Sequence, residues 1–459
     1  MSTSSTQSSG TSPAVKFPLS VETLAGHAIV ELARRFGTPV FVYDAAMIAQ
    51  RIADLAEFDV VRYAQKACSN LAILDLVRRH GVVVDAVSAG EIRRALAAGF
   101  QPDKGEPLQI VYTADIFDRE SLDLVIEHLI PVNCGSPDMI DQYGQRVPGG
   151  QITLRINPGF GHGHSQKTNT GGEGSKHGIW HEQLDDCVQR AAQYDLTIAG
   201  LHMHIGSGAD LKHLSQVCQA MAKTASAVGP TIQTISAGGG LSTPYREDDQ
   251  PLDLAAYYAL WNGTRQQLAE EFGHAVRLEI EPGRYLVAES GSLITEIRAI
   301  KHMGANLFYL VDAGFNNLAR PILYGAYHPL AVCSTHTSSE PGHPSLPVAA
   351  GPRLQEVIIG GPLCESGDIF TQTEGGYVAK RTLPEAQVGD YLVIGCTGAY
   401  GAVMGSNYNS KPLAAEVLLE DGTAHLIRTT QTFDDLIRGE KIPVSERGTG
   451  TFRSEDSSK

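Results

Sequence analysis

The sequence lacks any uninterrupted apolar stretch long enough to span a bilayer, which argues against a membrane-spanning helix. Its first residues, MSTSSTQSSGTSPAVKF, also lack the apolar core that a signal peptide needs, so we expect a cytoplasmic protein. Basic residues are few: 36 Lys and Arg against 51 Asp and Glu give a formal net charge of −15. Because phosphate backbones and anionic membrane surfaces repel such a chain, we expect neither nucleic acid nor a membrane as a partner.

Paired cysteines are lacking as well. Seven cysteines are scattered along the chain without a CxxC motif, so neither a disulfide framework nor a zinc ribbon is indicated. A composition of 42% hydrophobic and 19% charged residues excludes disorder, collagen and coiled coil as descriptions of the whole chain. The 459 residues suggest about three domains, or two if one of them is a large barrel.

Short β-branched runs alternate with amphipathic segments over residues 44–300. Eight such strand–helix units favour a (β/α)₈ TIM-type barrel over an open doubly wound sheet. The expected strands are 60–64, 82–87, 109–112, 130–133, 151–156, 197–205, 232–236 and 276–280. Helical spacing of apolar residues predicts helices at 71–80, 91–98, 211–227 and 254–272, among others.

The pattern changes after about residue 300, where strands follow one another without helices. Expected strands include 307–312, 354–359, 391–395, 416–420 and 425–429, and the Asp421-Gly422 dipeptide predicts a hairpin turn between the last two. Residues 17–43 and 301–446 are therefore expected to form a mainly antiparallel β domain, with one further strand at 40–43. Residues 1–16 and 447–459 lack apolar periodicity and are expected to be disordered tails.

Active groups of such a barrel sit at the C-terminal ends of its strands, and the first of these ends carries a lysine. Lys66 follows the first strand in YAQKACSN. A lysine at that depth suits Schiff-base chemistry, although it could also be a surface lysine whose ammonium reaches solvent.

The sixth strand ends in GLHMHIGSG. His202 and His204 are two apart and would share a strand face, which is the spacing of paired zinc ligands in barrel metal hydrolases. One imidazole could instead stack on an aromatic cofactor while Ser207 donates a hydrogen bond to a phosphate, or both could be core histidines. The motif alone leaves these alternatives open.

The last two strands end in a glycine triplet and a carboxylate. Gly238, Gly239 and Gly240 let the backbone approach an anion, but the segment has neither the GK[ST] of a P-loop nor the GxGxxG pattern. Glu281 stands at the mouth of the eighth strand with Arg284 beyond it, and the two could simply pair with each other. Lysine, imidazole, phosphate cradle and carboxylate together make up a pyridoxal phosphate site.

These motifs resemble those of the fold-type III pyridoxal phosphate-dependent decarboxylases, most closely the diaminopimelate decarboxylase family. The resemblance runs from about residue 17 to 437 and includes FDVVRYAQKACSN, HMHIGSG, AGGGLS, EIEPGR, GPLCESGD and TGAYGAVMGSNYN. It implies an alanine racemase-like fold of a barrel plus a β domain, pyridoxal 5′-phosphate as the cofactor, no metal, and a homodimer with shared active sites. The segment Lys-Ala-Cys departs from the commoner Lys-Ala-Asn, and Cys68 is interpreted as a packing residue.

The resemblance also implies roles for individual residues. Lys66 forms the Schiff base, His204 stacks on the cofactor ring, and Glu281 contacts the pyridine nitrogen. The phosphate contacts are Ser207 and Gly238–Gly240. The remaining implied contacts are Arg284 and Tyr400 for cofactor and substrate, Arg320 and Tyr324 for the substrate, and, from across a dimer interface, Cys364 as proton donor and Glu365 on the distal amino group.

The expected reaction is decarboxylation of meso-2,6-diaminopimelate to L-lysine and CO₂. An acid at position 281 favours decarboxylation, since racemases of this fold place an arginine opposite the ring nitrogen. A second hypothesis is a decarboxylase acting on D-ornithine, D-lysine or arginine, which would leave a specificity arginine unpaired. Two further alternatives are a metal hydrolase using His202 and His204, and a non-catalytic cofactor carrier, which would lack the second domain.

Overall fold

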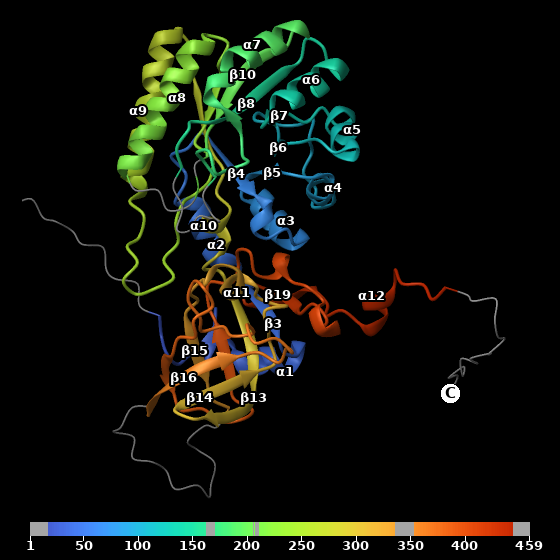
Figure 1. Ribbon diagram of the computed structural model, residues 1–459, viewed down its shortest axis with the longest axis vertical. Helices are drawn as coiled ribbons and strands as arrows, with labels where there is room; N and C mark the ends of the chain where they lie inside the picture. Colours follow the sequence, from blue (N-terminus) through green and yellow to red (C-terminus); the bar gives the residue numbers. More distant parts are fainter. Residues whose placement is uncertain (1–16, 162–169, 205, 207–210, 336–352, 444–459) are drawn as a thin grey trace, which may run out of the picture.

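The computed structural model describes residues 17–161, 170–204, 206, 211–335 and 353–443. Figure 1 shows a barrel surrounded by helices in the upper part and a second sheet in the lower part. None of the helices in these described ranges combines the length and the apolar character needed to cross a membrane. The two predicted tails and Ser207 lie outside the described residues, so the predictions for them stay predictions.

The upper part is the expected barrel. Eight parallel strands within the described ranges form a closed ring, because β8 pairs with β10 and β12 pairs with β4. The strands are β4 (Val60–Ala64), β5 (Val83–Ala86), β6 (Ile110–Ala114), β7 (Val132–Cys134), β8 (Gln151–Asn157), β10 (Thr197–His202), β11 (Thr234–Ser236) and β12 (Arg277–Ile280). A short strand, β9 (Ile179–Trp180), pairs with β8. The predicted fold class is confirmed.

Helices follow the barrel strands along the chain and bury their apolar faces against them. They are α3 (Leu71–Arg79), α4 (Ala89–Ala97), α5 (Arg119–Glu127), α6 (Pro137–Arg146), α7 (Leu184–Gln193), α8 (Leu211–Val228) and α9 (Leu254–Phe272). Several begin at a side chain that caps a free backbone N–H, as Asn70 and Ser88 do. Helix α9 is capped at its C-terminus by Gly273, whose φ of 74° is a conformation that glycine adopts without strain.

The lower part is a mixed, mainly antiparallel sheet in the order β17-β16-β14-β13-β3-β19-β20, with β18 pairing with β13 and β15. Its strands are β3 (Val40–Asp44), β13 (Gly291–Met303), β14 (Asn306–Val311), β15 (Leu330–Cys333), β16 (Leu354–Gly360), β17 (Arg381–Pro384), β18 (Tyr391–Ile394), β19 (Ala415–Glu420) and β20 (Thr423–Arg428). As predicted, residues 40–43 add a strand here, and Asp421 and Gly422 form the β19–β20 turn with positive φ angles of 48° and 72°.

The remaining β-strands and α-helices of the described ranges lie outside these two sets. They are β1 (Thr23–Leu24), β2 (His27–Ala28), α1 (Ile29–Phe36), α2 (Ala45–Ala53), α10 (Arg284–Val287), α11 (Arg320–Tyr324) and α12 (Phe433–Ile437). One boundary differs from the expectation: we placed residues 291–300 with the barrel, whereas β13 begins at Gly291 and pairs with β3 and β18. The strand follows α10 almost directly, so the chain enters the second sheet before residue 300.

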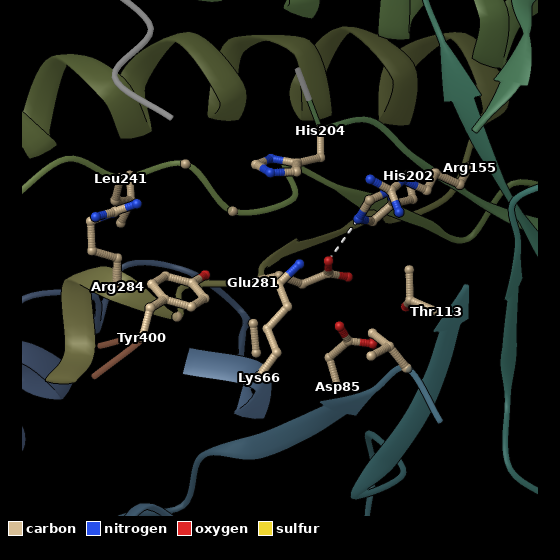
Figure 2. A pocket seen from close by; sticks show the side chains of 15 residues that line it. Lys66, Asp85, Thr113, Arg155, His202, His204, Leu241, Glu281, Arg284 and Tyr400 are labelled. Atoms are coloured by element: carbon tan, nitrogen blue, oxygen red, sulfur yellow. Dashed lines mark hydrogen bonds and ion pairs between the residues drawn. The ribbon is translucent and has the colours of Figure 1, made fainter. Parts of the chain in front are cut away.

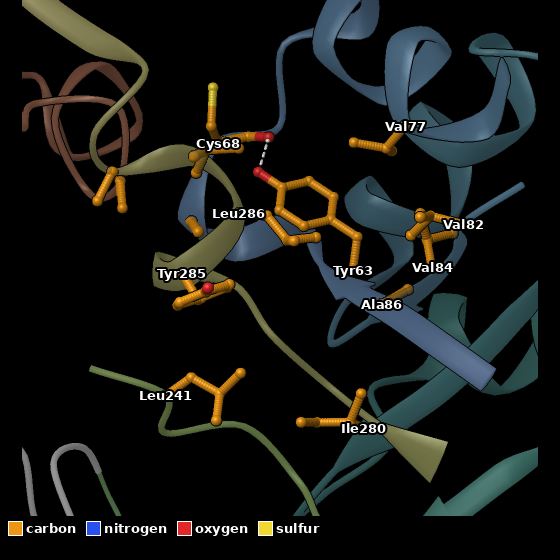
Figure 3. Close-up of a cluster of buried hydrophobic side chains, with 14 of the residues drawn as sticks. Tyr63, Cys68, Val77, Val82, Val84, Ala86, Leu241, Ile280, Tyr285 and Leu286 are labelled. Carbon is orange, nitrogen blue, oxygen red and sulfur yellow. Dashed lines mark hydrogen bonds between the residues drawn. The ribbon is translucent and has the colours of Figure 1, made fainter. Parts of the chain in front are cut away.

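The first barrel strand is anchored to the core directly before and after Lys66. The Tyr63 hydroxyl donates to the backbone carbonyl of Cys68 at 2.8 Å, and Figure 3 shows this pair beside Val77 and Val84. Cys68 is buried, and burial raises the pKa of its thiol to about 12. The thiol therefore stays protonated and packs, as the sequence interpretation holds. Between these anchors, Lys66 sits in a 3₁₀ turn, η1 (Gln65–Ala67), with an exposed side chain.

Candidate active site

One pocket lies at the C-terminal ends of the barrel strands (Figure 2). Helix α10 and the loop after β18 also contribute to its wall. Its lining comprises Ala64, Lys66, Asp85, Val87, Thr113, Arg155, His202, His204, Gly239, Gly240, Leu241, Glu281, Gly283, Arg284 and Tyr400. Lys66, His204, Arg284 and Tyr400 also border an adjoining cavity of about 1030 Å³. The structure thus brings together seven of the predicted site residues from separate parts of the sequence.

Glu281 is a buried carboxylate held from two sides. His202 Nε2 lies 2.6 Å from Glu281 Oε2, and Ser236 Oγ donates to Oε1 at 3.2 Å. Burial alone would raise the pKa of Glu281, but the charge and the hydrogen bond of His202, followed by Arg62 and Arg155, lower it. Because Arg284 instead donates to the Tyr245 hydroxyl, the alternative of a Glu281–Arg284 pair does not hold.

The two histidines have different surroundings. Strand β10 ends at His202, short of the predicted end at residue 205, so the strand alternation that would place both imidazoles on one face does not reach His204. Both imidazoles line the pocket, and the His202 ring bonds Glu281 (Figure 2). Within the described ranges, no three His, Cys, Asp or Glu side chains are grouped so that they could hold a metal ion. Burial, then the charges of Arg155 and Lys66, hold the pKa of His204 well below its usual value.

The glycine triplet is packed too tightly to carry side chains. A Cβ on Gly240 would lie 2.2 Å from the carbonyl oxygen of Gly206, and one on Gly239 would lie 2.6 Å from that of Glu281. Gly238 and Gly240 also have positive φ angles of 62° and 103°. Bare backbone at 239 and 240 therefore lines the pocket, as a phosphate cradle requires.

Arg284 and Arg320 border the large cavity, and both contact Tyr245. Arg284 Nη1 donates to the Tyr245 hydroxyl at 3.0 Å, and the guanidinium carbon of Arg320 lies 4.9 Å from the centre of the Tyr245 ring. Arg320 is 7% exposed, and no carboxylate in the described part of the chain pairs with either arginine. Tyr324 borders the same cavity. The arrangement suits a ligand that brings its own carboxylates.

Sequence reasoning missed Asp85, Thr113, Arg155 and Tyr245. Asp85 and Arg155 lie on barrel strands within the described ranges, Asp85 near the end of β5, so a polar residue at a strand end was an available signal. Asp85 Oδ1 and His204 Nδ1 are buried without a hydrogen-bond partner in the described residues. Such orphaned polar atoms in one pocket are explained when a polar ligand supplies their partners.

Within a single copy of the chain, Cys364 and Glu365 lie outside this pocket. They follow β16 in an exposed loop, where the Cys364 N–H donates to Asn409 Oδ1 at 2.8 Å. The buried Asp368 carboxylate accepts from the N–H groups of Leu363 and Phe315, which fixes the loop's base. Neither Cys364 nor Glu365 borders the two cavities described above.

Comparison with known proteins agrees with the family resemblance found in the sequence. Residues 46–288 match the family model described as the pyridoxal binding domain of pyridoxal-dependent decarboxylases. The diaminopimelate decarboxylase of Escherichia coli K12 is 54% identical over 414 residues, covering 90% of this chain and 96% of that protein. The enzyme of the same name from Streptomyces coelicolor is 52% identical over 420 residues, covering 92% and 93%.

Solved structures agree with this assignment. A crystal structure of a diaminopimelate decarboxylase, 54% identical, superposes with a TM-score of 0.84 over 89% of this chain and 95% of that chain. The Helicobacter pylori diaminopimelate decarboxylase complexed with L-lysine, 31% identical, gives a TM-score of 0.77 over 89% and 98%. The chain therefore belongs to the diaminopimelate decarboxylase family of pyridoxal-dependent decarboxylases.

Proposed function

We propose that this protein removes one carboxylate of meso-2,6-diaminopimelate to give L-lysine and CO₂, the last step of bacterial lysine biosynthesis, with pyridoxal 5′-phosphate as its cofactor. One observation carries the proposal: the buried Glu281 carboxylate, which is hydrogen-bonded by His202 and Ser236, lies in the same pocket as Lys66. A cytoplasmic location is part of the proposal, since seven unpaired cysteines fit a reducing compartment.

The residues of the pocket fit this cofactor. Lys66 offers an amine for its aldehyde, the bare backbone of Gly239 and Gly240 offers room for its phosphate, and His204 offers a neutral, flat imidazole for its ring. When bound, pyridoxal phosphate supplies an electron sink for the charge that remains on the substrate carbon after CO₂ leaves. The Glu281 carboxylate would strengthen that sink, because a negative charge beside the ring nitrogen would favour its protonated form.

The arginines would orient the substrate. Arg320 and Arg284 lie on the wall of the large cavity, so carboxylates of the ligand can supply the anionic partner that each cation lacks among the described residues. Holding the far end of a diamino diacid fixes which carboxylate stands ready to leave, because the bond that breaks must align with the electron sink. A substrate without the second carboxylate would leave a buried guanidinium unpaired.

The proton that replaces CO₂ needs a donor, and we assign it to Cys364 of a second copy of the chain, with Glu365 on the distal amino group. Of the seven cysteines, all in the described part of the chain, only Cys364 is exposed. Its loop is held by Asp368 and Asn409 yet does not reach the pocket of its own chain. A two-fold dimer would exchange these loops in both directions.

A substrate panel tests the proposed function. We expect CO₂ release from meso-diaminopimelate to exceed that from D-lysine, D-ornithine and arginine by about 10²-fold or more in kcat/KM, because breaking a buried ion pair costs about 3–5 kcal/mol. CO₂ and amino-acid products are measured with the cofactor-loaded protein. Equal or greater turnover of a substrate with a single carboxylate would favour the second hypothesis, and a colourless protein that retains zinc would favour a metal hydrolase.

Replacing Glu281 by glutamine is expected to lower kcat on the order of 10²-fold or more without a matching rise in KM, since a neutral amide cannot keep the ring nitrogen protonated. Glu289→Gln is the matched control, because Glu289 pairs with Arg51 outside the pocket. Steady-state CO₂ release and cofactor content are measured for both variants. An unchanged kcat in a cofactor-loaded Glu281→Gln protein would remove Glu281 from the mechanism.

A further inference from the structure

His328 is a buried titratable group that the proposed mechanism does not use. It is 4% exposed and lies just before β15. Its Nε2 atom lies 3.0 Å from Arg320 Nη1, and its Nδ1 atom lies 3.0 Å from the carbonyl oxygen of Gly395. Its ring also meets the Tyr245 ring edge to face at 5.5 Å. Both ring nitrogens of His328 thus have a hydrogen-bond partner, and one of these partners is Arg320, which borders the large cavity.

These two contacts determine the protonation state of the ring. A backbone carbonyl can only accept a hydrogen bond, so Nδ1 of His328 must carry a proton. A guanidinium can only donate, so Nε2 must be unprotonated. Both bonds can exist together only in the neutral imidazole. Burial, followed by the charge of Arg320, holds the pKa of His328 well below its usual value, in keeping with this geometry.

The Gly395 carbonyl is itself a rigid support. Gly395 N–H donates to the carbonyl of Pro329 at 2.9 Å, next to His328 in the chain, and β18 pairs with β15 directly beyond it. Arg320, in contrast, stands at the start of the five-residue helix α11, without a carboxylate partner among the described residues. The ring therefore links a buried cationic side chain to the sheet.

We infer that His328 is a positioning residue, which holds the Arg320 guanidinium toward the cavity for a carboxylate of the substrate while leaving its positive charge unneutralised. A carboxylate at this position would bind Arg320 equally well but would cancel the charge that a ligand carboxylate needs. A cation would repel both Arg320 and Arg284. A neutral acceptor orients the guanidinium without either effect.

The inference rests on the proposed function, which supplies the ligand. Decarboxylation at one end of meso-diaminopimelate leaves L-lysine, whose remaining carboxylate is the distal one that Arg320 would hold. Binding of L-lysine, compared with binding of 1,5-diaminopentane, which lacks a carboxylate, therefore reports on Arg320 without any turnover.

Three substitutions separate positioning from packing. Glutamine can present an acceptor in place of Nε2, so His328→Gln should keep KM within about threefold of the wild type. His328→Leu removes the acceptor and should raise KM and the Kd of L-lysine about tenfold or more, as expected for a hydrogen bond to a charged group. His328→Glu keeps an acceptor but adds a negative charge. It should raise KM and the Kd of L-lysine at least as much as His328→Leu does.

The kcat of His328→Gln should stay within about threefold of the wild type. In the leucine and glutamate variants the rise in KM and in the Kd of L-lysine should exceed any loss of kcat, because distal binding that the ground and transition states share appears in KM. Binding of 1,5-diaminopentane should not change. His274→Gln is the matched control, because His274 also bonds backbone carbonyls but lies outside both cavities. Calorimetric titration and steady-state kinetics are measured on the cofactor-loaded proteins, with thermal unfolding of each variant.

The inference is overturned if His328→Glu binds L-lysine as tightly as His328→Gln does, whatever the leucine variant does. It is also overturned if all three variants lose kcat and thermal stability in parallel, since that pattern indicates packing alone. Should His328→Leu fail to fold, the Gln and Glu pair still decides, because the two differ mainly in charge. If the wild type neither binds L-lysine nor releases CO₂ from diaminopimelate, the proposed function itself has failed.

Discussion

Lys66→Ala is expected to abolish turnover while leaving the fold intact. The amine is the group that would hold the cofactor's aldehyde, and removing a covalent catalytic group typically lowers kcat on the order of 10³-fold or more. Its side chain is exposed to the pocket, whereas the packing around it comes from Tyr63 and Cys68. Thermal unfolding should therefore change little.

The measurement is CO₂ release by a cofactor-loaded Lys66→Ala preparation, with Lys301→Ala as the control. Lys301 lies exposed on β13, away from both cavities. Wild-type turnover in the Lys66 variant would contradict the assignment. Loss of turnover together with unfolding would show instead that Lys66 supports the barrel.

Mixing Lys66→Ala with Cys364→Ala is expected to restore activity that neither variant has alone. If the Cys364 loop reaches the neighbouring barrel, each heterodimer contains one site with both defects and one with neither. About half of the wild-type activity per heterodimer should then return, because a two-fold interface exchanges identical segments. Subunit exchange is confirmed first, and CO₂ release is then measured.

The matched control replaces Cys364→Ala by the double variant Lys66→Ala, Cys364→Ala, which cannot form an intact site with Lys66→Ala. An active Cys364→Ala protein would mean that this thiol is structural. Two inactive variants without recovery after confirmed exchange would mean that each site is built from one chain.

Much of the fold could be predicted because barrel strands are short, buried and β-branched. Strand β4 and helix α9 have the expected bounds, and the other barrel strands differ from theirs by a few residues at their ends. Three strands of the second sheet, β13, β15 and β17, did not stand out. Strand β17 contains Pro384, and the outer half of β13 is polar and exposed.

The site was predictable where a residue stands at a strand end, as Lys66 and Glu281 do. It was not predictable where a contact joins distant elements. The partner of His202 proved to be Glu281, two strands away in the barrel, and sequence spacing could not distinguish that contact from a metal site. Tyr245 and His328 reach Arg320 only through the folded arrangement of a barrel loop and the second sheet.

Borohydride reduction of the cofactor-loaded protein, followed by peptide mass mapping, tests most directly whether the barrel mouth holds pyridoxal phosphate on Lys66. We expect the visible absorbance of the Lys66–cofactor imine to disappear and the reduced cofactor to remain attached to the peptide that contains Lys66. Attachment to a different lysine, or no covalent attachment in a protein that still releases CO₂ from diaminopimelate, would contradict this expectation.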